Sequence, residues 1–433
     1  MSNSILIKGG SILGGDIKDL LIRDGRIVEI SPSITTSTDE VIDAQGCILM
    51  PGFVDLHTHL REPGRENSET IATGSLAAAR GGYVAVSAMA NTLPVADTAA
   101  IVEQVSAIGK RVGLVDVFPI GAVTKGLEGH ELADLASMAH SGAQVRVFSD
   151  DGNCVSDPLL MRRALEYVKQ FDGVIAQHAQ DPRLTEGSQM NEGVIASTLG
   201  LKGWPAVAEE SIIARDILLA NMVGSRLHIC HVTTRGGVEI IRWAKAQGMK
   251  VTSEVTPHHL LLTDELAESY DPIYKVNPPL RTQSDVEALR EGLADGTIDI
   301  IGTDHAPHPV ESKECEWQSA AFGMVGLETA FPILYSTLIA TGKITWERAA
   351  QVMSIAPAAI AGYSGHGQEI REGAPAHIAV INPAGTLVVD RAQLASKSKN
   401  TPFHGMEFQG TVVATVFNGH LTHKVGVRSE KDE

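Results

Sequence analysis

The stretch "GFVDLHTH" at residues 52–59 is the first of eight short apolar runs that together determine the predicted fold. Runs of this length and composition are typical of buried strands, and the segments between several of them, such as 156–171 and 210–223, have helical composition. The other seven runs are "VAVSAM" (84–89), "GLVDVF" (113–118), "QVRVFS" (144–149), "GVIAQH" (173–178), "RLHICH" (226–231), "KVTSEV" (250–255) and "IDIIGTD" (298–304).

Strands that alternate with helices predict an α/β fold with a parallel sheet covered by helices. Eight such units over roughly 250 residues have the size and count of a (β/α)₈ TIM-like barrel. A doubly wound open sheet is the structural alternative. It usually carries a Gly-rich phosphate turn between a strand and a helix, and "GGSILGG" (9–15) does not stand between such elements.

Both ends of the chain read as short strands. The segment 20–30 contains Asp24-Gly25, a strong hairpin signal, and the segment 411–423 contains a second turn at Asn418-Gly419. Because the ends of a domain often lie close together, we expect one small β-domain built from both terminal segments. The predicted organisation is residues 1–50 and 366–433 for this β-domain, 51–365 for the barrel, and a disordered charged tail "SEKDE" at the end.

Composition excludes several classes of protein. Apolar residues make up 43% and charged residues 20% of the chain, and the net charge of -17 leaves no basic footprint for nucleic acid or an anionic membrane. The four cysteines form no CxxC pair, so neither a disulfide framework nor a cysteine-rich zinc site is indicated. With no signal-like start and no long apolar run, we expect a soluble cytoplasmic protein.

Polar residues gather at the carboxyl ends of the predicted strands, where a parallel barrel carries its chemistry. The first run ends in His57 and His59, and later runs end in or are followed by Asn91, Asp150, Asp151, His178, His231, His258, His259, Asp304 and His305. A single histidine at a strand end is usually structural. Burying this many polar groups without partners would cost on the order of several kcal/mol, so the pattern favours a shared metal site.

Side chains alternate along a strand, so His57 and His59 are expected to point the same way. We expect Phe53 and Asp55 to lie behind them inside the barrel, and Val54, Leu56 and Thr58 to face the helices.

Two imidazoles on one face can bind one ion, and His178 with His231 on neighbouring strands could bind a second. Asp151 lies between the two groups, and Asp304 on the last strand adjoins the first because a barrel closes. The arrangement predicts a two-metal hydrolase, with zinc favoured for an imidazole-rich site and Mn²⁺ or Co²⁺ as substitutes.

Several segments together resemble the dihydroorotases of the amidohydrolase superfamily. They are "VDLHTHLREPG" (54–64), "SDDG" (149–152), "HVTT" (231–234), "EVTPHHLLLT" (254–263), "KVNPPLR" (275–281), "GTDHAPH" (302–308) and "NTPFHG" (400–405). The HxH pair alone marks only the superfamily, whereas "HLREPG", "KVNPPL" and "TDHAPH" in combination are far more specific. The resemblance implies reversible hydrolysis of (S)-dihydroorotate to N-carbamoyl-L-aspartate in pyrimidine biosynthesis.

The resemblance also implies a ligand set for two Zn²⁺ per subunit. One ion would be held by His57, His59 and Asp304, and the other by His178 and His231. Asp151 would bridge them in place of the carboxylated lysine that many amidohydrolases use; its spacing from His178 favours it over Asp150, although the motif alone leaves the pair ambiguous. A metal-bridged hydroxide would attack the ring amide, with Asp304 as general acid and base.

Arg61 and Asn91 suit recognition of a substrate carboxylate, since a guanidinium can bind it with two hydrogen bonds. The resemblance completes the substrate site with His59, Asn277, His308, Phe322 and Gly323. It makes residues 308–323 a loop over the active site whose closure could gate turnover.

Two other functions stay open at this point. One is a different cyclic amidohydrolase (a hydantoinase, dihydropyrimidinase or allantoinase), which the presence of Arg61 and the lack of a lysine in "VRVFSDDG" (145–152) disfavour. The other is an inactive homologue that serves as a structural partner of aspartate transcarbamoylase, which the retention of all six ligand positions disfavours. We expect a homodimer, and association with a transcarbamoylase is a further possibility.

Overall fold

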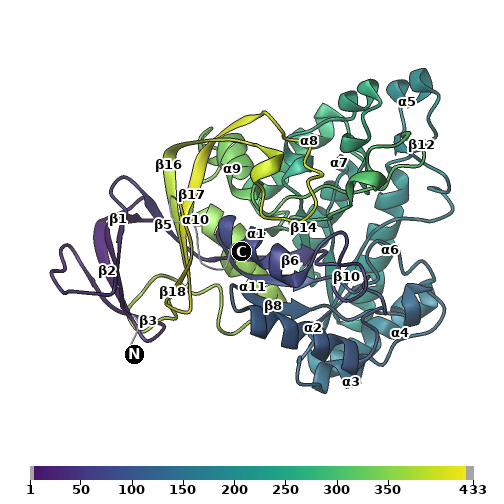
Figure 1. The fold of residues 1–433 in the computed structure, drawn as a ribbon. Coiled ribbons are helices and arrows are strands. Elements are labelled where there is room, and N and C mark those ends of the chain that lie inside the picture. The colour runs from purple at the N-terminus through teal and green to yellow at the C-terminus, as the bar shows by residue number, and fades with distance from the viewer. Residues whose placement is uncertain (1–3, 426–433) are drawn as a thin grey trace.

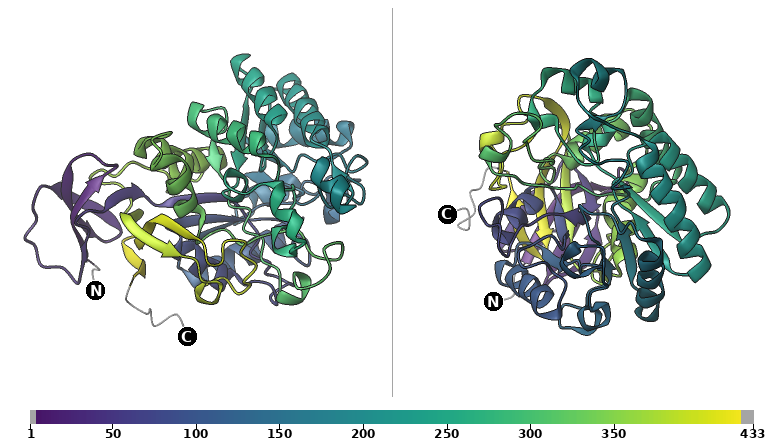
Figure 2. Two further views of the ribbon diagram at one scale, coloured as in Figure 1. Left: turned by 90° about the horizontal axis from the view of Figure 1, so that it is seen from above. Right: turned by 90° about the vertical axis from the view of Figure 1, so that its right-hand side faces the viewer.

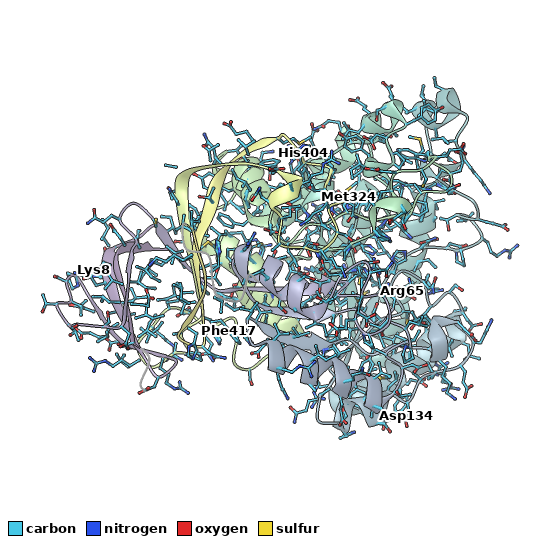
Figure 3. All side chains as sticks on the ribbon, viewed as in Figure 1. Lys8, Arg65, Asp134, Met324, His404 and Phe417 are labelled. Atoms are coloured by element: carbon cyan, nitrogen blue, oxygen red, sulfur yellow. The ribbon has the colours of Figure 1, made fainter. Side chains whose placement is uncertain are left out.

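The computed structural model describes residues 4–425, so the tail predicted to be disordered lies outside the described residues. The chain forms a sheet from its two ends and a larger α/β part from its middle (Figure 1). In Figure 3, Lys8 marks the terminal sheet and Arg65 marks the α/β part.

The terminal sheet joins strands from opposite ends of the sequence. Its path runs β18-β17-β16-β5-β1-β2-β3, with β4 paired to β1. The strands are β1 (Ser4–Ile12), β2 (Ile17–Arg23), β3 (Arg26–Ser31), β4 (Glu40–Asp43), β5 (Ile48–Pro51), β16 (Ile378–Val388), β17 (Glu407–Phe417) and β18 (His420–Lys424). The two ends meet where β5 pairs antiparallel with β16, Pro51 opposite Ile378.

Both predicted hairpins are present. Asp24-Gly25 connects β2 to β3 and Asn418-Gly419 connects β17 to β18, and all four residues have positive φ angles between 48° and 77°. Asn-Gly and Asp-Gly adopt this left-handed backbone at little cost, and its twist matches that of the flanking strands. The turn chemistry therefore sets the register of both hairpins.

The middle of the chain contains eight parallel strands, one at each predicted apolar run. They are β6 (Phe53–Thr58), β7 (Tyr83–Ala88), β8 (Asp116–Pro119), β9 (Val147–Phe148), β10 (Val174–Gln177), β13 (Arg226–Ile229), β14 (Val251–Val255) and β15 (Ile300–Ile301). β7 begins one residue before its run and β8 ends one residue after its run. The strands form the sheets β6-β7-β8 and β9-β10-β13-β14-β15. Single parallel bridges link these sheets at both ends, Gly121 to Phe148 and Thr58 to His305.

Helices lie around the outside of these strands (Figure 2). They are α1 (Ile71–Arg80), α2 (Ala99–Val112), α3 (Leu135–His140), α4 (Pro158–Val168), α6 (Val207–Val223), α7 (Arg235–Ala246) and α8 (Gln283–Asp295). In α4 the Asp157 side chain caps the first turn and Pro158 occupies a position that needs no N–H donor. Within residues 4–425, no helix combines the length and apolar character needed to cross a membrane.

Shorter elements complete the fold. They are β11 (Met190–Asn191), β12 (Gly203–Trp204), α5 (Val194–Leu199), α9 (Ala330–Leu334), α10 (Trp346–Ala350) and α11 (Ala356–Ala361). Short 3-10 helices lie at η1 (Lys125–Leu127), η2 (Lys169–Phe171), η3 (His258–Leu260), η4 (Asp264–Ser269), η5 (Pro272–Tyr274), η6 (Val310–Ser312) and η9 (Arg391–Gln393). Two π-helical segments lie at η7 (Tyr335–Ile339) and η8 (Gln351–Ile355).

His57 and His59 point the same way, toward Asp151 and Asp304, as predicted, but the predicted directions of Phe53, Val54 and Leu56 along β6 are wrong. Val54 and Leu56 pack in one cluster with side chains of β7, β9, β10 and β15, so they point into the space that the strands enclose. Phe53 instead stacks on Phe331 of α9, with ring centroids 5.4 Å apart. The physical reason is that the pairing of β6 with β7 shifts register twice, between Phe53 and Val54 and between Asp55 and Thr58, which breaks the two-residue period.

Strand boundaries also differ from the apolar runs. The third run begins at 113, but β8 begins at Asp116 because Gly113 ends α2 with a left-handed backbone, φ 67°. The eighth run spans seven residues, but β15 has only two, and Asp304 after it has a φ of 46°. Hydrophobicity therefore located each strand but not its ends.

Candidate metal centre

Four histidines meet at the carboxyl ends of the parallel strands. His57 lies at the end of β6 and His59 just after it, while His178 follows β10 and His231 follows β13. Each is at most 4% exposed. β10 pairs directly with β13, whereas β6 belongs to the other sheet and is linked through the bridge from Thr58 to His305, so residues far apart in sequence share one buried site.

Asp151, which follows β9, lies between the two histidine pairs. Its Oδ2 is 3.4 Å from His57 Nε2 and 3.3 Å from His59 Nε2. Its Oδ1 is 3.1 Å from both His178 Nδ1 and His231 Nε2. One carboxylate therefore turns one oxygen toward each pair, as a group shared by two cations would.

Asp304, which follows β15, joins the first pair. Its Oδ1 is 3.1 Å from His59 Nε2 and 3.5 Å from His57 Nε2. Burial raises the pKa of Asp304, but His57 and His59 outweigh it and bring the pKa down to about 2. The carboxylate is therefore ionised at neutral pH and can accept a proton.

The outer nitrogens of three histidines are each held by a fixed partner. His57 Nδ1 contacts Glu254 Oε1 at 2.5 Å, and His59 Nδ1 contacts Asn91 Oδ1 at 2.9 Å. His178 Nε2 contacts Gln180 Oε1 at 2.7 Å. Because each partner atom is an acceptor, each ring carries its proton on the outer nitrogen and turns a lone pair inward. This is how proteins orient histidines that bind metals.

The histidine nitrogens that face the cluster are placed to bind a metal ion and do not pair well with one another. His178 Nδ1 and His231 Nε2 are 2.9 Å apart, although both can be lone-pair donors, and the buried His57 Nε2 has no hydrogen-bond partner. The ligand atoms of His57, His59 and Asp151 lie within 4.8 Å of one another, as do those of Asp151, His178 and His231. Imidazole and carboxylate groups at this spacing form two candidate metal-binding groups that share Asp151.

Asp150, the alternative to Asp151 in the motif, turns away from the histidines. Its Oδ1 accepts hydrogen bonds from the backbone N–H groups of Val123 and Thr124, at 2.8 and 2.9 Å. The Thr124 hydroxyl donates to its Oδ2. Asp150 therefore anchors the loop after β8, and only Asp151 faces the cluster.

Arg61 lies beside the cluster and is 7% exposed. Its Nε donates to Pro307 O at 3.2 Å, and its Nη2 is 3.5 Å from His308 Nε2. Burial lowers the pKa of Arg61 to about 10, so it remains a cation at neutral pH. Burial and the charge of Arg61 lower the pKa of His308 to about 3, which keeps that ring neutral.

Asn277 offers a further polar group. Its Nδ2 donates to Gln180 Oε1 at 3.2 Å, while its Oδ1 is buried without a hydrogen-bond partner. Gln180 therefore connects Asn277 to His178. A buried acceptor without a donor is costly, which favours a ligand that supplies one.

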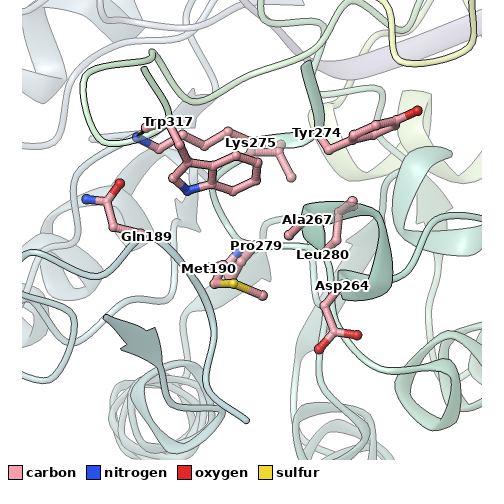
Figure 4. Close-up of a pocket in the computed structure, with 10 residues that line it drawn as sticks. Gln189, Met190, Asp264, Ala267, Tyr274, Lys275, Pro279, Leu280 and Trp317 are labelled. Carbon is pink, nitrogen blue, oxygen red and sulfur yellow. Dashed lines mark hydrogen bonds between the residues drawn. The ribbon is translucent and has the colours of Figure 1, made fainter. Parts of the chain in front are cut away.

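The loop at residues 308–323 is held against the protein by two lysines. Lys313 Nζ donates to the carbonyl oxygens of Lys275, Ala321 and Gly323 at 2.9–3.1 Å. Lys275 Nζ donates to Trp317 O at 2.6 Å, and its side chain extends toward Trp317 in Figure 4. His308 Nε2 donates to Phe322 O at 2.8 Å, which ties the two ends of the loop together.

Gly323 has a φ of 142°. A Cβ atom there would lie 2.8 Å from the Ala306 Cβ and 2.9 Å from the His308 ring, so any side chain would displace this part of the site. The residue thus brings backbone close to His308 where another residue could not.

Sequence reasoning missed Glu254 and Gln180, which contact His57 and His178. Glu254 stands inside the strand β14, whereas the predicted site residues lie at or after strand ends. A charged residue within an otherwise buried strand was the available signal. His259, left outside the predicted site, contacts Thr256 Oγ1 at 2.7 Å and Pro278 O at 3.1 Å, and so supports the turn that carries Asn277.

Named relatives align with nearly the whole chain. A family model described as "Dihydro-orotase-like" matches residues 46–237. The chain is 60% identical over 418 residues to a dihydroorotase of Streptomyces coelicolor, covering 96% of this chain and 97% of the relative. It is 53% identical over 425 residues to a dihydroorotase of Mycobacterium tuberculosis, covering 98% and 99%.

Solved structures of hydantoinases and dihydropyrimidinases share the fold. An L-hydantoinase (dihydropyrimidinase) from Arthrobacter aurescens matches with a TM-score of 0.87 at 27% identity, covering 99% of this chain and 98% of that one. A dihydropyrimidinase from Brevibacillus agri matches with a TM-score of 0.82 at 23% identity, covering 98% and 95%. The overall architecture is therefore that of the hydantoinase and dihydropyrimidinase structures.

Proposed function

The chain belongs to the dihydroorotase family, and on that premise we propose that it catalyses the reversible hydrolysis of (S)-dihydroorotate to N-carbamoyl-L-aspartate. The observation that carries the proposal is the 60% identity with a named dihydroorotase over nearly the full length of both chains. The buried cluster of four histidines and two aspartates supplies the chemistry that such a hydrolysis needs.

The residues that would hold two Zn²⁺ follow from the contacts of the cluster. His57, His59 and Asp304 would hold one ion, and His178 and His231 the other, with Asp151 shared between them. When bound, the ions would lower the pKa of an attacking water and polarise the amide carbonyl of the substrate. The outer partners Glu254, Asn91 and Gln180 would keep the ligand rings in the productive orientation.

Asp304 would act as the general acid and base. It is ionised at neutral pH and its Oδ1 lies against His57 and His59, at the point where water would be activated. It would take the proton of the attacking water and pass it to the departing ring nitrogen. In the ring-closing direction Asp304 would take a proton from the ureido nitrogen and return it to the departing water.

Arg61 and Asn91 would bind the substrate carboxylate. The buried guanidinium donates to a backbone oxygen through Nε, and its remaining N–H groups would pair with the carboxylate. The Oδ1 of Asn91 faces His59, which leaves its amide N–H bonds as donors. The unpartnered Asn277 Oδ1 supports a role as acceptor for a substrate N–H. His59, His308, Phe322 and Gly323 would complete the walls of the site.

The finer architecture belongs to the same proposal. Bridges at both ends of the two parallel sheets support a closed (β/α)₈ barrel over residues 51–365. Residues 1–50 and 366–433 would then be the two parts of the small β-domain. A cytoplasmic location, a homodimer and association with aspartate transcarbamoylase stay predictions.

Other cyclic amidohydrolases are the alternative to exclude, because the solved structures with the same fold are hydantoinases. Arg61 and the aspartate at position 151 favour dihydroorotate over a hydantoin, since an uncharged ring needs no cationic partner. An inactive scaffold is disfavoured because all six ligand positions keep residues that can bind metal.

The test compares substrates with one preparation of zinc-loaded protein. Hydrolysis of dihydroorotate, hydantoin, dihydrouracil and allantoin is measured side by side, together with the metal content. We expect dihydroorotate to be the preferred substrate and about two zinc ions per chain. Preference for hydantoin or allantoin would overturn the substrate assignment. Protein that retains no zinc once the excess is removed and hydrolyses none of the four compounds would overturn the enzyme assignment.

A further inference from the structure

Glu254 is a buried carboxylate next to the metal centre that none of the six proposed ligand positions includes. It lies in β14 and is 1% exposed. Resting on the function proposed above, we propose that Glu254 is a positioning residue that fixes the orientation of His57 and links the two halves of the metal centre.

The contact with His57 determines which nitrogen faces the ligands. Glu254 Oε1 is 2.5 Å from His57 Nδ1, and an ionised carboxylate can only accept, so the ring proton is on Nδ1. The opposite nitrogen, Nε2, then presents a lone pair toward Asp151 and Asp304. Without this acceptor the neutral ring could take the other tautomer, which would turn an N–H toward the ion.

The same carboxylate also contacts the strand that carries the second half of the site. The backbone N–H of His231 donates to Oε1 at 3.3 Å, and His228 Nε2 contacts Oε2 at 3.2 Å. Glu254 therefore connects β6, which carries His57, with His228 of β13 and with His231 just beyond that strand. Displacing the carboxylate would disturb His57 and His231 together.

A glycine after the neighbouring strand β15 leaves room for the Glu254 carboxylate. Gly302 follows β15, and a Cβ atom at this position would overlap the carboxylate of Glu254. Because Glu254 is enclosed by His57, His228 and the backbone at 231, it has little freedom to move aside. Gly302 therefore offers a second way to disturb the contact while keeping the charge.

Glu254 could alternatively be a ligand itself, since its oxygen, His57 and Cys230 place ligand atoms within 4.8 Å of one another. Two ligand atoms that each lie about 2 Å from a tetrahedral zinc ion stand roughly 3.3 Å apart. Glu254 Oε1 and His57 Nδ1 are 2.5 Å apart, well below that separation, which leaves the two atoms in direct contact as a short hydrogen bond. The geometry thus favours positioning, and a third ion becomes an outcome of the test.

The experiment uses the full chain as wild type, Glu254→Gln, Glu254→Asp and Gly302→Ala, with Asp19→Asn as the matched control. Asp19 is a buried carboxylate of the terminal sheet that accepts from Gly9 N and Ile34 N, both at 2.8 Å. Zinc affinity is measured by chelator competition, and the Co²⁺-loaded proteins are compared by their visible spectra. Thermal unfolding of the metal-free proteins checks that every variant folds, and kcat and KM for dihydroorotate are measured separately.

For Glu254→Gln we expect zinc affinity and kcat each to fall by about 10–100-fold, a changed Co²⁺ spectrum and an unchanged KM. Gly302→Ala should change the spectrum in the same direction, Glu254→Asp should recover part of the loss, and Asp19→Asn should match wild type in all metal readouts. Unchanged metal affinity and spectrum in a folded Glu254→Gln variant would overturn the proposal, as would a third zinc equivalent that Cys230→Ser and Glu254→Gln both remove. A wild-type protein without zinc or activity would instead overturn the proposed function.

Discussion

The terminal sheet and the metal centre are buried to the same degree but are built from opposite residue types. The core of the sheet consists of apolar side chains such as Ile7, Leu20, Ile22, Ile378 and Val380, each fully buried. The metal centre buries four histidines and two aspartates, at most 4% exposed.

The two regions also differ in how completely their polar atoms are paired. Within the described residues 4–51 and 378–425, every buried side-chain nitrogen and oxygen has a hydrogen-bond partner, whereas the metal centre leaves His57 Nε2 and Asn277 Oδ1 without one. Packing alone accounts for the sheet. The metal centre keeps polar groups that become satisfied only when something binds, so burial there serves function at a cost to stability.

Removing the metal should have the largest effect, because it acts on the metal centre and leaves the terminal sheet unchanged. We expect a chelator to abolish dihydroorotate hydrolysis, because the nucleophile is lost, and to lower the melting temperature of the protein, because the ligands then repel or stay unpaired. Activity assays and thermal unfolding before and after chelation measure both effects. Full activity after dialysis to metal-free protein would contradict the comparison, and restoration by added Zn²⁺ is the control.

Asp304→Asn should have the next largest effect. Asparagine keeps the shape but cannot accept the proton and is a poor ligand, so we expect kcat to fall by about 10³-fold or more. Steady-state kinetics measure the loss. Asp150→Asn is the control, since Asp150 contacts the loop after β8 and not the histidines. An equal loss of activity in both variants would mean that the two aspartates do not differ in role.

Arg61→Lys should act on substrate binding more than on chemistry. Lysine keeps the charge but loses the two-pronged donor geometry, and we expect KM for dihydroorotate to rise by about 10-fold with zinc content unchanged. Kinetics and metal analysis of the same preparation provide the check. A loss of zinc in this variant would show that Arg61 supports the metal centre instead.

Ile378→Val in the terminal sheet should give the smallest effect on activity. The removed methylene lies in a fully buried apolar cluster, so the free energy of unfolding should fall by about 0.5–1.5 kcal/mol. Denaturant unfolding measures this change, and kcat and KM should stay at wild-type values. A kinetic effect would show that the sheet and the metal centre are coupled.

The same contrast explains how much of the fold was predictable. The eight parallel strands and both hairpins followed from apolar runs and from Asp-Gly and Asn-Gly turns, because these signals are local. The orientation of Val54 and Leu56 was not predictable, since it depends on register shifts between β6 and β7 that no single strand encodes. The two-residue length of β15 likewise reflects pairing with its neighbour and not its own composition.

The candidate site was predictable where one residue type marks one role. Histidines and aspartates after strand ends are unusual enough to be found from sequence, and they lie together in the structure. Glu254 and Gln180 were missed because their role depends on a partner across the strands. The choice between Asp150 and Asp151 likewise depends on side-chain direction, which a pair of adjacent identical residues does not reveal.

The pairing of β5 with β16 has a consequence for folding during synthesis on the ribosome. Pro51 leaves the ribosome long before its partner Ile378 is made. At 5–20 residues per second the delay is roughly 15–65 s. During that interval β1 to β5 present an uncovered strand edge and half of an apolar core, which other chains can join. A nascent chain stalled before β16 should therefore bind chaperones through its first 51 residues, and release them once β16 to β18 emerge.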